Sequence, residues 1–149
     1  MKQPFDPPDP DFANRIKESF SNQKFMSLIG AKLVDVQPGY CEIHLPFRDD
    51  LTQQHGYFHA AVTTSIADSG AGYAAFTLMP TGHEVLSVEF KVNLLTPGQG
   101  KLLIAKAYVL KTGRTLTVCR ADVFVIKDGQ EKLCAAAQVT LISLKPKVD

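Results

Sequence analysis

Two periodicities of apolar residues divide the chain. Apolar positions recur every four residues over 12–20, and a second apolar run covers 25–29; together they predict two short helical segments. From residue 33 the period becomes two. Strands are expected over 33–37 and 40–47, and Pro38-Gly39 supplies the turn between them, so this region predicts a β-hairpin.

The stretch from His59 to Met79 differs from its surroundings because small residues dominate it. We expect a helix of about 20 residues, roughly 30 Å long at 1.5 Å per residue. It is apolar on all sides, which is typical of a buried helix. Gly70 and Gly72 each cost about 1 kcal/mol relative to alanine inside a helix, so they indicate close packing of the helix against a sheet.

The rest of the chain predicts four long strands joined by short turns, which favours an antiparallel meander. The expected fold is α+β, with a long central helix wrapped by a curved antiparallel sheet. One helix cannot cover both faces of such a sheet, so a second copy of the chain is expected to bury part of the uncovered surface. The expected strands are 85–95, 101–111, 115–127 and 132–144.

Length and composition narrow the class of protein. A chain of 149 residues indicates one domain, expected over 11–149, while the four prolines within residues 1–10 predict a flexible N-terminal arm. The formal net charge of +1 gives no general field for nucleic acid, and no apolar run is long enough to span a bilayer. The N-terminus lacks the apolar core of a secretory signal.

The three cysteines are an odd number, lie far apart in the sequence and have apolar neighbours. A disulfide framework or a zinc site needs closer clustering, so reduced, buried thiols in a cytoplasmic protein are expected. The cysteines are Cys41, Cys119 and Cys134.

Candidate chemistry gathers where a glycine-containing loop, residues 53–58, runs into the start of the long helix. Free backbone N–H groups and the helix dipole at such a point favour an oxygen that gains negative charge. Asp68 lies nine residues after His59 within an otherwise apolar helix. An acid there is costly to bury without a partner, so it is either hydrogen-bonded, solvated at a cleft, or functional.

His59-Ala60-Ala61 followed by Asp68 resembles the HGG-x6-D signature of hotdog-fold acyl-CoA thioesterases of the PaaI-like family. Residues 86–98 resemble the strand that follows the helix in that family, and residues 113–116 resemble a later turn. The resemblance covers roughly residues 28–144. It implies a hotdog fold and a thioester hydrolase that releases free CoA and a carboxylic acid.

The same resemblance implies roles for five residues. The backbone N–H of Ala60 would polarise the thioester carbonyl, and Asp68 from the other subunit would act as general base or nucleophile. Ser87 would lie near Asp68 and help to hold the attacking water. His59 would orient the loop that binds the thioester, and Gln53 matches a position where related enzymes place Asn or Gln near the reacting group.

The departure from the family pattern is alanine in place of two glycines at Ala60 and Ala61. Alanine keeps the N–H donor, but its methyl group narrows the approach, so Ala61 is expected to contact substrate. Lys111 and Arg114, near a predicted turn, are placed as contacts to the phosphates of CoA. Taken singly, each is better explained as an ordinary solvated surface charge.

The reaction needs no metal or cofactor, and none is expected. His55 and His59 have the spacing of a metal pair, but Gly56 lies between them and no third ligand is near in the sequence. The resemblance implies at least a homodimer and favours a homotetramer. The alternatives are a hotdog hydratase or dehydratase, a non-catalytic acyl-CoA-binding module, which the Ala60-Ala61 departure favours, and a purely structural dimer.

Overall fold

The computed structural model describes residues 5–146. Two short helices come first, then a hairpin, a long helix and four long strands, as the periodicities predict, and a short 3-10 helix that was not predicted lies between the hairpin and the long helix. The elements are α1 (Phe12–Ser21), α2 (Lys24–Ile29), β1 (Lys32–Gln37), β2 (Tyr40–Pro46), η1 (Asp49–Leu51), α3 (Ala60–Phe76), β3 (Glu84–Leu94), β4 (Leu102–Thr112), β5 (Leu116–Lys127) and β6 (Gln130–Leu144).

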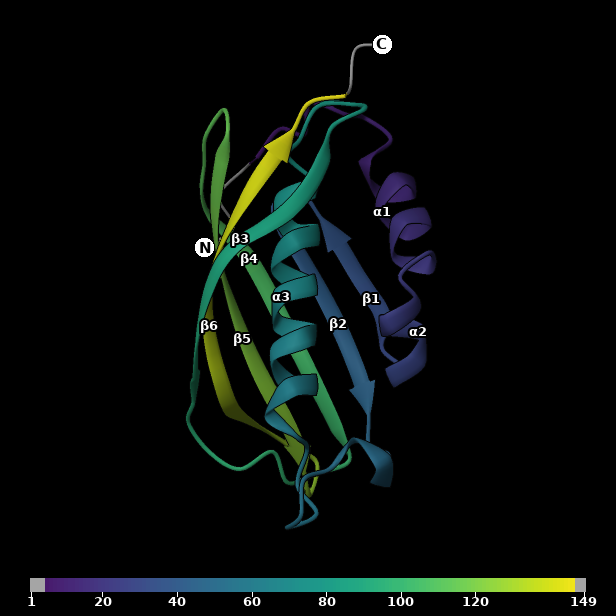
Figure 1. Ribbon diagram of the computed structural model, residues 1–149, viewed down its shortest axis with the longest axis vertical. Helices are drawn as coiled ribbons and strands as arrows, with labels where there is room; N and C mark the ends of the chain where they lie inside the picture. The colour runs from purple at the N-terminus through teal and green to yellow at the C-terminus, as the bar shows by residue number, and fades with distance from the viewer. Residues whose placement is uncertain (1–4, 147–149) are drawn as a thin grey trace.

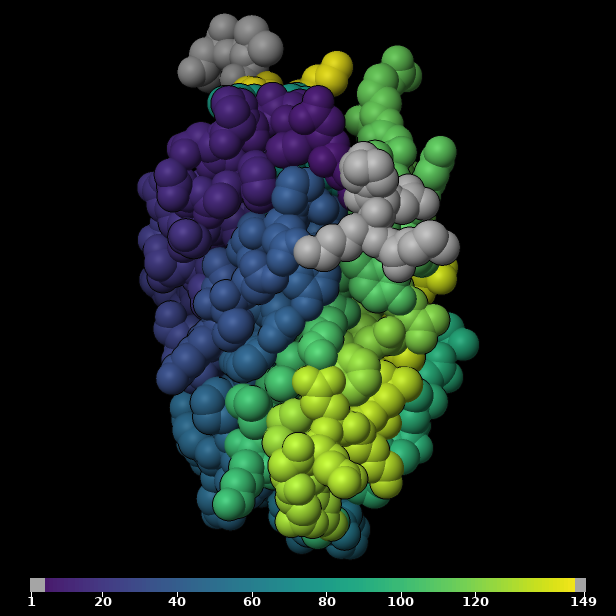
Figure 2. Space-filling model, turned by 180° about the vertical axis from the view of Figure 1, so that it is seen from behind, coloured from purple at the N-terminus to yellow at the C-terminus, as the bar shows by residue number. Residues whose placement is uncertain are grey.

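All six strands form one antiparallel sheet in the order β1-β2-β4-β5-β6-β3. The sheet curves around α3, whose axis follows the strands (Figure 1). From behind, the strands form diagonal bands across an outer face that no helix within residues 5–146 covers (Figure 2). The prediction of a curved sheet around a central helix is confirmed.

The prediction of a four-strand meander is wrong in one respect. β4, β5 and β6 are consecutive neighbours, but β3 pairs with β6 at the far edge of the sheet. The connection after β3 contains Thr96-Pro97-Gly98, and Pro97 lacks the N–H that a tight hairpin ladder would use. The chain therefore crosses to the other side of the sheet, and β3 becomes an edge strand.

The core lies between α3 and the concave face of the sheet. Ile66, Ala67, Ala71 and Ala74 are almost fully buried there. A Cβ placed on Gly70 would lie 3.3 Å from the Cβ of Ala107 on β4, so this glycine allows close approach of the helix to the sheet. The packing role predicted for Gly70 is confirmed.

The long helix is shorter than predicted because it ends at Phe76 rather than near Met79. The buried hydroxyl of Thr77 donates to the Ala74 carbonyl and accepts the N–H of Gly39, 2.7 Å away in each case. Arg15 of α1 donates to the carbonyls of Phe76 and Met79, as well as to that of Pro80. These bonds satisfy the end of the helix with side chains in place of another helical turn.

The expected N-terminal arm, 1–10, lies partly outside the described residues. Of the remainder, Phe5 packs against the turn at Gly39, where a Cβ would lie 2.5 Å from the Phe5 ring. Asp9 is buried, and its carboxylate lies 3.3 Å from the Arg15 guanidinium. Residues 5–10 therefore contact the body of the protein.

The edge strand β3 is the most exposed strand of the sheet. Leu86, Val88, Phe90 and Leu94 are each more than half exposed, and one side of the strand has no neighbouring strand within residues 5–146. An apolar, unpaired edge is an unusual surface for a chain alone in water. In the described part of the chain, no helix has the length and apolar character to cross a membrane.

Candidate active site

The loop before α3 is held by a dense set of backbone hydrogen bonds. Gln53 N–H donates to the Tyr57 carbonyl and Gly56 N–H donates to the Gln53 carbonyl, both at 2.9 Å. Gly56 has φ +77°, a left-handed conformation that favours glycine. Phe58 N–H donates to Gly98 on the β3–β4 connection. The loop is therefore fixed to both the helix start and the sheet.

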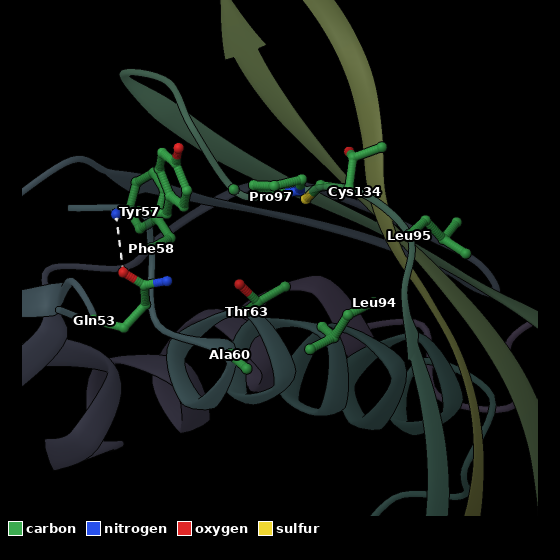
Figure 3. Close-up of a pocket in the computed structure, with 11 residues that line it drawn as sticks. Gln53, Tyr57, Phe58, Ala60, Thr63, Leu94, Leu95, Pro97 and Cys134 are labelled. Atoms are coloured by element: carbon green, nitrogen blue, oxygen red, sulfur yellow. Dashed lines mark hydrogen bonds between the residues drawn. The ribbon is translucent and has the colours of Figure 1, made fainter. Parts of the chain in front are cut away.

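The Gln53 side chain is oriented by this loop. Its Oε1 accepts the backbone N–H groups of His55 and Tyr57. Only the amide oxygen can accept, so the Nε2 group must point the other way. Nε2 makes no hydrogen bond to any residue in the described range, and Figure 3 shows it directed toward the space in front of Ala60. Gln53 therefore presents a free N–H donor there.

His59 is the N-cap of α3. Its Nδ1 accepts the N–H of Ala61 at 2.9 Å, so its ring proton lies on Nε2. The carbonyl of His59 accepts the N–H groups of Val62 and Thr63. The amide of Ala60 is the only one in the first helical turn that donates to no described residue. It is also the donor that the resemblance noted in the sequence implies for the thioester carbonyl, a role that stays a prediction.

These free donors border a pocket of about 380 Å³ at the N-terminal end of α3. Its walls come from the loop, the first turn of α3, the β3–β4 connection and β6, and they are mainly apolar (Figure 3). The lining residues are Gln53, Tyr57, Phe58, Ala60, Thr63, Leu94, Leu95, Thr96, Pro97, Gly98 and Cys134.

Asp68 lies two turns further along α3 and faces β3. Ser87 Oγ donates to Asp68 Oδ1 at 2.7 Å. The second oxygen, Oδ2, accepts no hydrogen bond from the described residues, so it is available to take a proton. The expected proximity of Ser87 and Asp68 is present in the structure.

Asp68 and Ala60 are eight residues apart, which is about 12 Å along a helix. A carbonyl held at the Ala60 N–H is therefore out of reach of Asp68 in the same chain. The β4–β5 hairpin, which carries Lys111 and Arg114, lies at the opposite end of α3 from Ala60 (Figure 1). The structure thus brings Gln53, His59 and Ala60 together in one group, and Asp68 with Ser87 in another.

Several pocket residues were not predicted from the sequence. Thr63, Leu94, Leu95 and Cys134 resemble ordinary core or strand residues until the fold brings them together. Burial raises the pKa of the Cys134 thiol to about 11, so it is a neutral, weakly polar wall residue at pH 7. Only the break in alternation at Cys134-Ala135 within β6 marks this position in the sequence.

Comparison with known proteins agrees with this arrangement of a long helix and a curved sheet. The sequence profile of the thioesterase superfamily matches residues 55–132, just over half of the chain. The chain belongs to the thioesterase superfamily, and it is a thioester hydrolase with a hotdog fold. The expected resemblance is confirmed.

Individual relatives support the same assignment. A thioesterase family protein from Silicibacter pomeroyi is 42% identical, and the match covers 90% of this chain and 98% of that one with a TM-score of 0.89. The 1,4-dihydroxy-2-naphthoyl-CoA hydrolase of Listeria monocytogenes is 28% identical over 80% of this chain and 94% of its own length. The E. coli PaaI protein has the same fold, with a TM-score of 0.82 at 16% identity over 93% of this chain and 97% of that one.

Proposed function

We propose that this protein hydrolyses acyl-CoA thioesters to a carboxylic acid and free CoA, in a site shared by two copies of the chain. The observation that carries the proposal is the pair of free N–H donors, Ala60 N–H and Gln53 Nε2, at the mouth of an apolar pocket. The activity named for the Listeria relative, hydrolysis of an aryl-CoA thioester, supports this class of substrate.

The two donors serve as an oxyanion hole. When water adds to the thioester carbon, negative charge moves onto the carbonyl oxygen, and preorganised N–H groups stabilise it most at that moment. The positive end of the α3 dipole acts in the same direction. His59 contributes indirectly, since its cap bond to the Ala61 N–H fixes the first turn that carries Ala60.

The base is Asp68 of the second copy. The exposed apolar edge of β3 supports antiparallel pairing with a second β3, which would cover Phe90 and Leu94 and place the second α3 beside the first. In a dimer of this kind, Asp68 of the second copy lies near Ala60, whereas Asp68 of the same chain is too far away. Two such dimers form the tetramer that the resemblance favours.

Hydrolysis proceeds by proton transfer to the carboxylate. Asp68 Oδ2 takes a proton from water as the water oxygen bonds to the thioester carbon, while Ser87 holds Oδ1. The tetrahedral adduct then expels the CoA sulfur, which leaves as a thiol after receiving the proton. If Asp68 attacks directly instead, it forms a mixed anhydride with loss of the CoA thiolate, and water then cleaves the anhydride at the Asp68 carboxyl carbon. A single turnover in ¹⁸O-labelled water then places the label in Asp68 and leaves the product unlabelled, and the label reaches the product in later turnovers.

Lys111 and Arg114 are proposed to meet the CoA phosphates from the second copy. Antiparallel pairing of two β3 strands brings the hairpin end of one subunit toward the Ala60 end of the other. The two cations would then flank the solvent side of the shared site. Replacing both with glutamine should raise KM for acyl-CoA and leave KM for a short acyl-pantetheine thioester unchanged.

The test is thiol release from a panel of short, medium, long and aryl acyl-CoA esters. Turnover that Asp68→Asn abolishes supports the proposal. Binding of acyl-CoA, seen as a rise in Tm, with no thiol release in wild type would instead favour a binding module, and a change in enoyl absorbance without free thiol would favour a hydratase. The methyl group of Ala60 on the pocket wall is the observation that keeps the binding module as the second candidate.

A further inference from the structure

The pocket at the start of α3 has one open side and one closed side. A thioester carbonyl at the Ala60 N–H has two substituents, the acyl group and the CoA chain. CoA carries amides and phosphates that must stay in water, whereas the wall toward β6 is apolar and closed. The acyl group is therefore the part that enters, and the closed wall limits its size.

Among the residues of that wall, Cys134 is the most deeply buried, with 2% of its surface exposed. Leu94 and Leu95 are about half exposed and lie at the open edge. Figure 3 shows the Cys134 sulfur on the sheet side of the pocket, with Thr63 of α3 on the other side. The thiol thus lies where an acyl group extending inward from Ala60 would end.

A β-bulge gives Cys134 this orientation. Val123 pairs with Ala135, but Phe124 pairs with Leu133, so Cys134 has no partner in the ladder. Two consecutive side chains of β6, Cys134 and Ala135, are therefore buried where alternation would bury one. The Cys134 carbonyl accepts the N–H groups of Leu95 and Thr96 at 2.8 and 3.3 Å, which fixes the bulge against the β3–β4 connection.

We propose that Cys134 is the specificity-determining residue that sets the largest acyl group this enzyme accepts, an inference that rests on the proposed thioesterase function. A cavity of about 150 Å³ holds a benzene ring. A pocket of about 380 Å³ therefore accepts an aryl group with a short linker or a medium-length linear chain, and long chains stop at the thiol.

The experiment measures kcat/KM for linear acyl-CoA esters of increasing length and for aryl esters, in wild type and in variants of one wall position. Cys134→Ala should move the optimum to longer or bulkier groups, and Cys134→Leu should move it to shorter ones. Each shift should change the ratio of kcat/KM between neighbouring substrates about tenfold, since one methylene in an apolar pocket is worth about 10–200-fold.

Two control variants separate pocket size from other effects. Cys119→Ala removes an equally buried thiol from β5 that does not line the pocket, so its substrate profile should equal that of wild type. Cys134→Ser keeps the size and should keep the position of the optimum. Circular dichroism and the Tm of each variant establish that it is folded. If Cys134→Leu fails to fold, the shift of the optimum in Cys134→Ala is enough to test the proposal.

The two proposals fail in different ways. Wild type without thiol release on any ester would overturn the thioesterase function. Wild-type turnover with the same chain-length profile in Cys134→Ala and Cys119→Ala would overturn the role of Cys134 and leave the function intact. A shift in profile for Cys134→Ala alone supports the inference.

Discussion

The two ends of α3 differ in how their backbone groups are satisfied. At the C-terminal end, the Arg15 guanidinium donates to the carbonyls of Phe76, Met79 and Pro80 at 2.8–3.0 Å, and its charge is balanced by buried Asp9. At the N-terminal end, a single histidine caps one N–H, and the Ala60 amide has no partner among the described residues. We call the C-terminal end of α3, whose carbonyls are satisfied by Arg15, the closed end, and the N-terminal end, where the Ala60 amide is free among the described residues, the open end.

The C-terminal end of α3 contributes to the stability of the fold, whereas the N-terminal end carries the groups proposed for catalysis. The C-terminal bonds join α1 to α3, and the Arg15 guanidinium also lies 4.4 Å from the centre of the Phe76 ring. The N-terminal end keeps donors free beside an apolar pocket, where they have no role in stability. Substitutions at the two ends should therefore affect different measurements: turnover at one end and the free energy of unfolding at the other.

The largest effect is expected from Asp68→Asn, which keeps the shape of the side chain and the Ser87 hydrogen bond but removes the base. Loss of a general base typically lowers kcat by about 10²–10⁴-fold. Thiol release measures it, and the Tm should change little. Asp122→Asn, on the opposite face of the sheet, is the matched control; wild-type turnover in Asp68→Asn would contradict the proposed role.

Gln53→Glu tests the open end directly. A glutamate still accepts the N–H groups of His55 and Tyr57, so the loop keeps its structure, but the Nε2 donor becomes an anionic oxygen. Removal of one oxyanion-hole donor costs about 10²–10³-fold in kcat. We expect steady-state kinetics to show this loss of kcat and thermal unfolding to show no change in Tm. Equal losses of kcat and folded protein would assign Gln53 to stability instead.

Arg15→Met tests the closed end. It removes the donors to the α3 carbonyls and leaves buried Asp9 without its cation, so about 3 kcal/mol of unfolding free energy should be lost. Arg15→Lys keeps the charge but loses the planar guanidinium with its several N–H donors, so it should recover only part of the lost unfolding free energy. Urea unfolding measures both. The kcat of the folded fraction should match wild type, and a fall in kcat would show that the two ends are coupled.

His59→Ala lies between these cases because the cap supports both helix and site. Loss of the bond from Ala61 N–H should lower the unfolding free energy by about 1 kcal/mol. Asparagine is a good N-cap residue, so His59→Asn should restore stability and most of the activity. If His59→Asn recovers stability but not kcat, the imidazole has a further role that a cap alone does not explain.

A smaller effect is expected on the outer face of the sheet. Burial raises the pKa of Glu42, but hydrogen bonds from Tyr40 and His44 outweigh it, so the pKa lies below its ordinary value of 4.5. The ionised form therefore stabilises the fold above about pH 4.5, and this contribution is lost as the pH falls through the lowered pKa. Glu42→Gln should cost about 0.5 kcal/mol at pH 7 and less at pH 3. An equal cost at both pH values would contradict the assignment.

Much of the fold could be predicted from the sequence, because the change from period four to period two is local. The position of β3 could not, since the pairing of β3 with β6 depends on a crossover and not on the strand itself. The Ala60 donor and a place for Gln53 near the reacting group were predicted from the resemblance, but the orientation of the Gln53 amide depends on a loop conformation. Cys134 was missed because its exposure to the pocket comes from a bulge.

In the proposed dimer, each site combines the N-terminal end of α3 from one subunit with Asp68 of the other. The most direct test co-expresses Asp68→Asn and Gln53→Glu chains, each inactive alone, and measures thiol release by the mixture. Half of the dimers are then mixed and each carries one intact site of two, so about a quarter of wild-type activity should return. A mixture no more active than its parents would place the whole site in one chain and contradict the account.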